Sequence, residues 1–252
     1  SKKLDITDYD NVNAVFDEYV PQYCINAAAY TAVDKAESES DKAYAINVLG
    51  AQNLAKLCKV NNTILLHVST DFVFDGNKIT PYTESDVPNP TGVYGKTKLE
   101  GELAIQELWK KHFIIRTSWV YSKFASNFMK TMLRLGAERE SLSVVNDQIG
   151  TPTNAVDLAI ALVKIITSCH SELDSESNYG IYNFSNEGQC SWYDFAKKIF
   201  EVNNINIDLQ PIPTTSYPTP AKRPAYSVLD KTKIKNTFSI KIDSWETSLS
   251  KI

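Results

Sequence analysis

The sequence has few cysteines, histidines and glycines, and each shortage excludes a class of protein. Its four cysteines, Cys24, Cys58, Cys169 and Cys190, lie far apart, with no C-x-x-C spacing and only three histidines in the chain. This usage predicts reduced thiols in a cytoplasmic protein, with no disulfide framework and no metal site. The nine glycines form no phosphate-binding run, and the first of them is Gly50.

Long apolar runs and a strong net charge are also absent. No run approaches the length that spans a membrane, and the first residues lack a signal-peptide pattern. The formal charge is −4, without a dense basic cluster, so we expect no nucleic-acid partner and no membrane partner. With 43% hydrophobic residues, the 252 residues can bury a substantial core in one domain or two.

Short apolar runs alternate with amphipathic segments over most of the chain. Nearly continuous apolar strands between such helices favour an α/β fold with a doubly wound parallel sheet. The expected strands are residues 23–25, 64–68, 113–115, 142–145 and 180–184. The first expected helix is capped by Asp8 or Asp10, and its apolar side consists of Val12, Val15, Phe16 and Tyr19. The second covers residues 41–60, and its buried side consists of Ala45, Ile46, Leu49, Leu54, Leu57 and Cys58. Further helices are expected over residues 94–110, 126–138 and 155–167, and after the cap Ser191.

The composition changes after residue 167. Residues 168–177 are polar and rich in serine, which predicts a flexible surface insertion. Residues 211–224 hold five prolines and predict a loop without a regular element. We therefore expect a boundary near residue 167, between a first region over residues 1–167 that holds the doubly wound sheet and a smaller region over residues 168–252, with some elements of the second returning to the main sheet.

Polar or small residues follow three of the predicted strands, at residues 27–31, 69–71 and 117–119. Ligands of parallel α/β sheets bind beyond the carboxyl ends of the strands. The three segments therefore predict one site. Small residues such as Ala27 to Ala29 let a flat ligand lie against the backbone, although a tight junction between strand and helix explains them equally well.

Tyr94 and Lys98 lie four residues apart, on one face of a predicted helix. A lysine ammonium near a phenol favours the phenolate and lowers the tyrosine pKa towards working pH. The hydroxyl of Thr70, at the end of the preceding strand, is placed to bind the same substrate oxygen. A Tyr-x-x-x-Lys pair alone is often a surface pair, but its position after a strand that ends in Ser-Thr-Asp favours acid chemistry. A loop cation such as Arg223 can hold a phosphate or remain a solvated charge.

Several longer motifs resemble those of dTDP-4-dehydrorhamnose reductases, which are extended short-chain dehydrogenases. They include NAAAYTAVDKAE at residues 26–37, STDFVFDG at 69–76, VYGKTK at 93–98 and RTSWVY at 116–121. Residues 146–153 and YPTPAKRP at 217–224 belong to the same resemblance, which spans nearly the whole chain. It implies a nucleotide-binding Rossmann-like domain over residues 1–167 and a mainly substrate-binding region over residues 168–252. It also implies NADPH or NADH as hydride donor. The implied reaction reduces dTDP-4-dehydro-L-rhamnose to dTDP-L-rhamnose, which is used for cell-surface polysaccharide.

The resemblance also implies roles for individual residues. Tyr94 is the expected general acid at the sugar C4 oxygen, and Lys98 is expected to hold the nicotinamide ribose and to lower the Tyr94 pKa. The expected substrate contacts are Thr70 to the reacting oxygen, Asp71 to a sugar hydroxyl, Trp119 to the sugar ring, and Arg223. Ala27, Ala28 and Ala29 are expected to line the cofactor. A homodimer is compatible with this assignment, and no metal ligand is expected.

The sequence departs from the family pattern at its start. Family members begin with a strand and a Gly-x-x-Gly-x-x-Gly turn that seats the pyrophosphate at a helix N-terminus. No such turn occurs here, so the resemblance implies that the sequence begins near the third strand of an N-terminally incomplete fold. A chain without that turn would lose its central strand and its pyrophosphate seat, which leaves the activity of this chain open.

Two other functions were weighed. The first is a non-catalytic binding protein that resembles the regulatory subunit of methionine adenosyltransferase. The lack of a phosphate turn favours it, and the presence of Thr70, Tyr94 and Lys98 opposes it. The second is a sugar-nucleotide dehydratase or epimerase. Dehydratases of the superfamily have Asp-Glu after the threonine, whereas Asp71 is followed here by Phe72. Simple reduction is therefore preferred.

Overall fold

The computed structural model describes residues 4–169 and 178–252. Most of the predicted insertion, residues 170–177, lies outside the described residues. The two residues that precede this stretch belong to helix α7 (Ala155–Cys169), so the helix is slightly longer than predicted.

The main sheet has four parallel strands in the order β1 (Tyr23–Asn26), β2 (Ile64–Thr70), β3 (His112–Thr117) and β8 (Gly180–Asn183). The pairing register places Asn26 beside His67, and Thr70 beside Thr117. The carboxyl ends of the first three strands therefore open at one edge of the sheet. The α/β class and the parallel sheet confirm the prediction.

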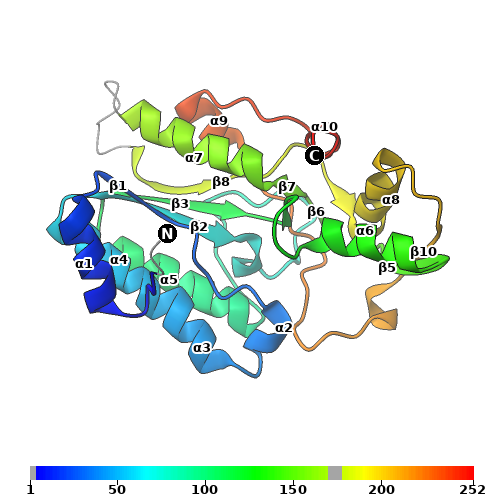
Figure 1. The fold of residues 1–252 in the computed structure, drawn as a ribbon, viewed down its shortest axis with the longest axis horizontal. Helices are drawn as coiled ribbons and strands as arrows, with labels where there is room; N and C mark the ends of the chain where they lie inside the picture. Colours follow the sequence, from blue (N-terminus) through cyan, green and yellow to red (C-terminus); the bar gives the residue numbers. More distant parts are fainter. Residues whose placement is uncertain (1–3, 170–177) are drawn as a thin grey trace.

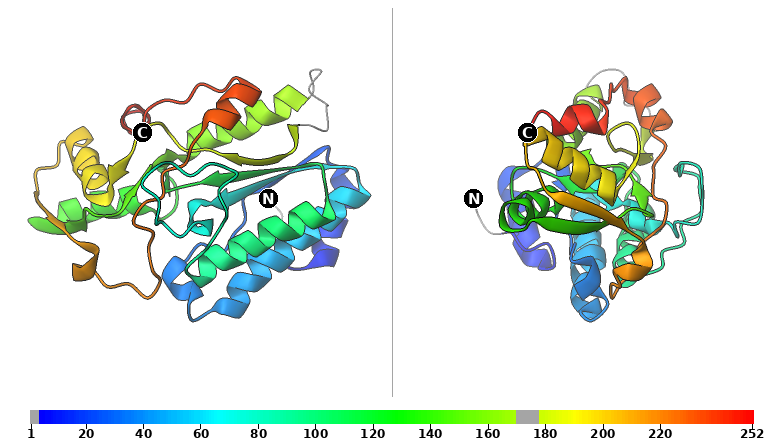
Figure 2. Two further views of the ribbon diagram at one scale, coloured as in Figure 1. Left: turned by 180° about the vertical axis from the view of Figure 1, so that it is seen from behind. Right: turned by 90° about the vertical axis from the view of Figure 1, so that its right-hand side faces the viewer.

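Helices cover both faces of this sheet (Figures 1 and 2). Helices α1 (Tyr9–Tyr19), α4 (Gly50–Val60) and α5 (Val93–Leu108) lie on one face, and α7 and α9 (Thr232–Phe238) lie on the other. Successive strand residues point to opposite faces, so Leu65 packs toward α4 while Leu66 packs toward α7. Both faces are buried, which explains the continuous apolar runs of β2 and β3.

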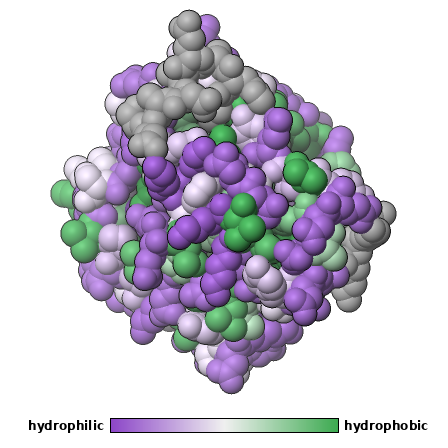
Figure 3. Space-filling model, turned by 90° about the vertical axis from the view of Figure 1, so that its left-hand side faces the viewer, coloured by the Kyte–Doolittle hydropathy of each residue, from purple (hydrophilic) through white to green (hydrophobic). Residues whose placement is uncertain are grey.

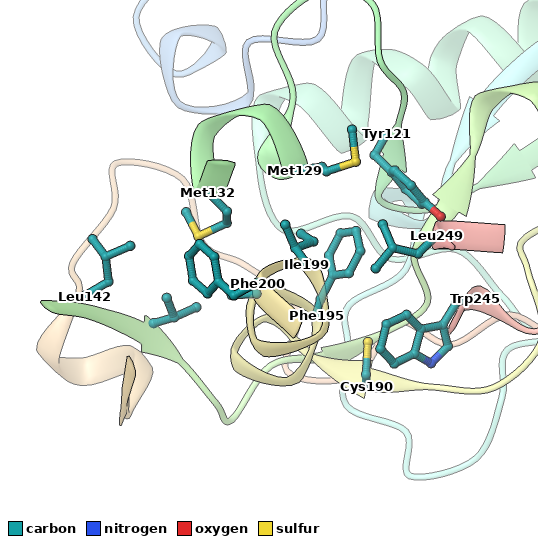
Figure 4. Close-up of a cluster of buried hydrophobic side chains, with 12 residues drawn as sticks. Tyr121, Met129, Met132, Leu142, Cys190, Phe195, Ile199, Phe200, Trp245 and Leu249 are labelled. Carbon is teal, nitrogen blue, oxygen red and sulfur yellow. The ribbon is translucent and has the colours of Figure 1, made fainter. Parts of the chain in front are cut away.

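A second lobe lies beyond the carboxyl ends of the strands. In it β5 (Ser141–Val145) pairs in parallel with β10 (Asp208–Ile212), and α6 (Phe128–Glu138) and α8 (Trp192–Val202) pack on the pair. Helix α10 (Trp245–Leu249) adds Trp245 and Leu249 to the same core. Figure 4 shows its core, in which aromatic and aliphatic side chains from these elements meet around Phe195. The strand predicted at residues 142–145 exists, but it does not join the main sheet as expected.

Strand β10 corrects the prediction that residues 211–224 contain no regular element. Pro211 and Ile212 pair with Val144 and Val145. A proline fits an edge strand when the missing N–H would point away from the ladder. Strand β10 is paired on one side only, and the next element is the short helix η4 (Thr214–Ser216). Elements are thus shared across residue 167, since β8 joins the first region and β5 pairs with the second.

The helix predicted over residues 41–60 is divided. It consists of α3 (Ser40–Tyr44), a π-helical segment η1 (Ala45–Leu49) and α4. A π turn adds a residue to the turn and rotates the side chains that follow. Leu49, expected on the buried side, is 41% exposed, while Asn47 is buried. Tyr19 of α1 is also exposed, contrary to expectation.

Short elements connect the lobes and shape the edge of the sheet. They are α2 (Val33–Ala36), η2 (Asp71–Val73), the parallel pair β4 (Val120–Tyr121) and β7 (Thr153–Asn154), and the antiparallel pair β6 (Ile149–Gly150) and β9 (Cys190–Ser191). On the left-hand face of the molecule, hydrophobic side chains form separate spots among hydrophilic ones (Figure 3). Among the described residues, no helix is long and apolar enough to cross a membrane.

Candidate active site

A cavity of about 700 Å³ lies between the two lobes, at the carboxyl ends of β1, β2 and β3. Its size is typical of sites for small molecules and cofactors. It brings together Ala27 and Ala29 after β1, residues 68–72 at the end of β2, and residues 117–120 after β3. Tyr94, Lys98 and Arg223 also line it. The predicted convergence of three strand ends is therefore present in the structure.

Helix α5 carries the acid–base residues and lies close to the end of β2. Tyr94, Lys98 and Glu102 follow one another at intervals of four residues and therefore share one face of the helix. Gly95 permits the close approach, because a Cβ at this position would clash with the Phe72 carbonyl oxygen. At the start of the helix, the Val93 N–H donates to Glu37 Oε1 (2.9 Å), which ties α5 to the segment after β1.

Tyr94 lines the cavity with its hydroxyl near Thr70 and Asp71. Burial raises the pKa of Tyr94 to about 12, the Thr70 hydroxyl acts in the opposite direction, and the Asp71 charge adds to the increase. Lys98 is not among these causes, and the expectation that Lys98 lowers the Tyr94 pKa stays a prediction for the site with its cofactor. Tyr94 therefore remains a neutral phenol at working pH, which is the form that a proton donor requires.

Lys98 is almost fully buried, and its Nζ donates to the Val68 carbonyl oxygen at 2.7 Å. The same nitrogen lies 3.2 Å from His67 Nε2. Burial lowers the pKa of Lys98 to about 8, while the Glu102 charge acts in the opposite direction. The side chain thus lies beside Tyr94 on the cavity wall, and its amine changes charge near working pH.

Thr70 and Asp71 form the other side of the acid site. Thr70 caps η2 by accepting the Phe72 N–H, and its hydroxyl donates to Asp71 Oδ1 at 3.0 Å. Within the described residues, the buried Asp71 Oδ2 has no hydrogen-bond partner. Burial raises the pKa of Asp71 to about 6, and the nearby Ser227 and Thr70 hydroxyls act in the opposite direction. A buried carboxylate oxygen that lacks a donor fits a ligand hydroxyl at this wall of the cavity.

Phe72 lies where dehydratases of this superfamily have their second carboxylate. Its ring meets the Tyr94 ring edge-on, with the centroids 5.5 Å apart and the planes at 71°. An aromatic edge cannot accept or donate the proton that elimination requires. The contact is consistent with the preference for simple reduction over a dehydratase.

Trp119 also lines the cavity, but one face of its ring is already covered and cannot pack on a sugar. Its ring stacks on Trp192 of α8, with centroids 3.5 Å apart and planes at 9°. The backbone of Gly150 contacts the same indole, and a Cβ there would lie 2.6 Å from Cε2. Trp119 also has a φ of 45°, in the left-handed region that a bulky residue rarely adopts. Trp192 and Phe128, which line the cavity beside it, were not predicted as site residues.

The alanines after β1 and Arg223 were both predicted to contact ligands, and not all of them line the cavity. Ala27 and Ala29 line the cavity, whereas the Ala28 N–H turns back to Asn26 Oδ1 (3.1 Å). Arg223 lines the cavity and forms an ion pair with Asp34 Oδ2 (2.7 Å). Its Nη1 is buried and lacks a partner among the described residues, so the guanidinium can still donate to a ligand.

A buried polar cluster beneath the cavity also escaped the sequence analysis. The Ser69 hydroxyl and the Arg116 guanidinium both donate to the Glu102 carboxylate, and Arg116 Nη2 lies 2.6 Å from Oε2. Glu102 and Arg116 are almost completely buried. The cluster joins α5 to β2 and β3 and so fixes the helix that carries Tyr94. The repeat of Tyr94, Lys98 and Glu102 was the available signal for it.

Comparison with known proteins gives one consistent result. The family described as RmlD substrate binding domain matches residues 1–252. The chain is similar to a dTDP-4-dehydrorhamnose reductase of Aggregatibacter actinomycetemcomitans, with 46% identity over 256 residues that cover 99% of this chain and 86% of that protein. It also resembles solved dTDP-4-dehydrorhamnose reductases from Bacillus anthracis, in complex with NADP, and from Clostridium acetobutylicum. Their TM-scores are 0.93 and 0.92 and their identities 43% and 44%, and each match covers 98% of this chain and 85% of the other.

Proposed function

The chain belongs to the RmlD substrate binding domain family, and from this membership and the cavity we propose that it is a dTDP-4-dehydrorhamnose reductase. It would use NADPH or NADH to reduce dTDP-4-dehydro-L-rhamnose to dTDP-L-rhamnose. One observation supports this most strongly. Tyr94, Thr70 and Lys98 line one cavity together with a buried carboxylate oxygen of Asp71 that lacks a donor among the described residues.

The residues present fit a nicotinamide cofactor. Ala27 and Ala29 leave room for a flat ligand after β1, and the buried Lys98 lines the same cavity. Lys98 would hold the nicotinamide ribose, and the alanine backbone would lie against the ring. When bound, the reduced cofactor supplies hydride to a carbonyl carbon.

The residues of this chain supply the proton and the orientation. Tyr94, neutral at working pH, donates its proton to the C4 oxygen of the sugar. The Thr70 hydroxyl would turn from Asp71 Oδ1 to donate to the same oxygen and direct it towards the phenol. Asp71 accepts a sugar hydroxyl through Oδ2, and Arg223 is placed to donate to the diphosphate through Nη1. The aromatic wall of Trp119 excludes water from the opposite side.

The place of action forms part of the proposal. The described cysteines Cys24, Cys58 and Cys190 are free thiols. Free thiols suit a reducing compartment, in agreement with the cytoplasmic location expected from the sequence.

The test is an assay of purified protein with dTDP-4-dehydro-L-rhamnose and reduced nicotinamide cofactor. Cofactor oxidation is followed by absorbance, and the product is identified by mass and by NMR of the sugar. We expect stoichiometric formation of dTDP-L-rhamnose. Binding of the dTDP-sugar by calorimetry without turnover would instead favour the non-catalytic binding protein. Glucose-configured dTDP-sugar serves as the control substrate and should not be reduced.

A further inference from the structure

The short helix α2, which follows β1, is bound to the loop of residues 217–224. Asp34 of this helix accepts two hydrogen bonds from the loop, although the donors lie 187 and 189 positions further along the chain. Its Oδ1 accepts the Ala221 N–H at 3.2 Å, and its Oδ2 accepts Arg223 Nη2 at 2.7 Å. The loop passes α2 on its way from the second lobe in Figures 1 and 2. The proposed reaction does not use Asp34.

The guanidinium of Arg223 is held in one orientation. Nη2 is bound by Asp34, and the guanidinium carbon lies 5.9 Å from the centroid of the Phe72 ring. Just beyond, the Tyr226 N–H donates to the Gly76 carbonyl oxygen, which fixes the backbone of the loop. The remaining Nη1 is buried and lacks a partner among the described residues, in a side chain that lines the cavity. The arginine therefore has a donor ready for an anion in the cavity.

A carboxylate beside a guanidinium can compete with a ligand for its donors, or it can hold the guanidinium so that other donors face the ligand. Asp34 binds only Nη2, and its second oxygen binds the loop backbone instead of the guanidinium. The Asp34 side chain is 40% exposed and that of Arg223 is 21% exposed, so solvent reaches the carboxylate while Nη1 stays covered. These contacts favour the holding role.

The same short segment also holds the helix of the proton donor. Glu37, three residues after Asp34, accepts the Val93 N–H at 2.9 Å, at the first residue of α5. Tyr94 is the next residue of that helix. The two carboxylates therefore connect Arg223 and Tyr94 to one stretch of backbone, which sets the distance between the loop cation and the acid.

We propose that Asp34 is a positioning residue of this reductase: it holds Arg223 so that Nη1 donates to the diphosphate of the dTDP-sugar, at a fixed place relative to Tyr94. This inference rests on the proposed function, because the diphosphate is the anion of the proposed substrate. Diphosphate oxygens are ordinary acceptors for guanidinium N–H groups. An arginine that is already oriented loses less conformational entropy when the anion binds, so the ion pair raises the affinity although Asp34 is itself negative.

The first test measures binding of dTDP to the full chain by calorimetry, without cofactor and without turnover. Asp34→Asn keeps an oxygen that can accept the Ala221 N–H but removes the charged partner of Arg223. We expect the Kd for dTDP to rise about 10-fold. A Kd that is unchanged or lower would overturn the proposal, and a lower value would show that Asp34 competes with the ligand. If the unmodified protein binds no dTDP, the proposed function itself fails, and this inference fails with it.

A double-mutant cycle separates positioning from a general effect of charge. Arg223→Met should raise the Kd for dTDP at least as much as Asp34→Asn does. In the Arg223→Met background, Asp34→Asn should change the Kd by less than about 2-fold, because the group that it positions is gone. Equal effects of Asp34→Asn in the two backgrounds would contradict the positioning role.

Asp41→Asn is the matched control for the loss of one negative charge. Asp41 is exposed on α3 and does not line the cavity. Because solvent and salt screen an exposed charge, we expect the Kd for dTDP to stay within about 2-fold in this variant. A rise as large as that in Asp34→Asn would assign the effect to net charge and overturn the proposal.

Steady-state kinetics give a readout that a purely structural role would not change. In Asp34→Asn we expect the KM for the dTDP-sugar to rise about 10-fold, while kcat and the KM for the cofactor stay within about 3-fold. Asp34→Glu keeps a carboxylate and should bring the KM for the dTDP-sugar back to within about 3-fold of the unmodified enzyme. The melting temperature of both variants should change little, because a partly exposed ion pair contributes little to stability. A fall in active enzyme with an unchanged KM for the dTDP-sugar would show that Asp34 is only structural.

Discussion

The two lobes that meet at the cavity bury different kinds of side chain. The sheet lobe buries His67, Lys98, Glu102 and Arg116 directly beside the site, and each has a hydrogen-bond or ion-pair partner. The core of the second lobe consists of aromatic and aliphatic side chains around Phe195 (Figure 4). It reaches the cavity through the stacked rings of Trp119 and Trp192 and through Phe128 of α6.

This difference indicates that the two lobes have different roles in the site. Buried charged groups are costly unless every partner is in place, so the sheet lobe holds its acid–base residues in one geometry. Apolar rings pack without such strict requirements and can be exchanged at smaller cost. We infer that the sheet lobe determines the chemistry and that the second lobe determines which ligand is held against it. The experiments that follow test this division from the largest expected effect to the smallest.

The buried ion pair should be the most sensitive point of the sheet lobe. Glu102→Leu leaves Arg116 charged and without its partner, and we expect a loss of about 3–5 kcal/mol in the free energy of unfolding. The double variant Glu102→Leu with Arg116→Met removes both charges and should regain most of that loss. Urea unfolding followed by circular dichroism measures both. Additive losses in the double variant would show that the pair does not act as a unit.

Removal of the proton donor should abolish most of the chemistry while the fold remains. Tyr94→Phe keeps the ring and its contact with Phe72, and we expect kcat/KM to fall about 10²-fold or more. The melting temperature, measured in parallel, should change little. Near-normal turnover by the folded variant would assign Tyr94 a purely structural role.

Asp71 should lower the free energy of unfolding at neutral pH while it contributes to activity. Its pKa is raised to about 6, above the value of about 3.9 in an unfolded chain, so its ionisation destabilises the fold above pH 6 and costs nothing below about pH 4. Asp71→Asn should therefore raise the free energy of unfolding at pH 7.5 by about 1–3 kcal/mol, with the gain disappearing towards pH 4. Activity should fall in the same variant.

The carboxylate of Asp75 is the control for the predicted sign of the change in the free energy of unfolding. Asp75 accepts from the Asn77 N–H, Asn89 and Tyr82, and these hydrogen bonds hold its pKa below the ordinary value. Asp75→Asn should therefore destabilise the fold at neutral pH. Equal signs for the two variants, measured by urea unfolding at several pH values, would refute the assignment.

The smallest effect is expected from the stacked rings of Trp119 and Trp192 that line the cavity. Trp192→Leu removes the ring that supports Trp119, and we expect the KM for the dTDP-sugar to rise about 10-fold while kcat stays within about 3-fold. The KM for the cofactor should not change. Tyr193→Leu, the next residue of the same helix, does not line the cavity and is the matched control. A large fall in kcat for Trp192→Leu would contradict the division between the lobes.

Local sequence patterns were sufficient for most elements of the sheet lobe, although not for the π-helical segment that divides the helix predicted over residues 41–60. The apolar run of residues 64–68 lies in strand β2, as predicted. Tyr94 and Lys98, four residues apart, lie on one face of helix α5. These features depend on neighbours a few positions apart. The joining of three strand ends at one cavity followed from the rule for parallel sheets, and the structure confirms that convergence.

Contacts between distant segments were beyond the sequence. Trp192 stacks on Trp119 from 73 positions away, and nothing local distinguishes it from an ordinary helix residue. The pairing of β5 with β10 depends in the same way on two segments far apart. The direction of the Lys98 amine could not be predicted either, because it depends on where His67 and the Val68 carbonyl oxygen lie.

The central claim is that the site holds Tyr94 as a neutral acid, and its titration tests this most directly. Protein labelled with ¹³C at the tyrosine Cζ shows one signal for each of the 13 tyrosines, and Tyr94→Phe identifies the relevant one. Because burial raises the pKa of Tyr94 to about 12, its signal should keep the phenol position beyond about pH 10, where ordinary tyrosines ionise. A midpoint near neutral pH would show that Tyr94 is held as a phenolate and would contradict the account.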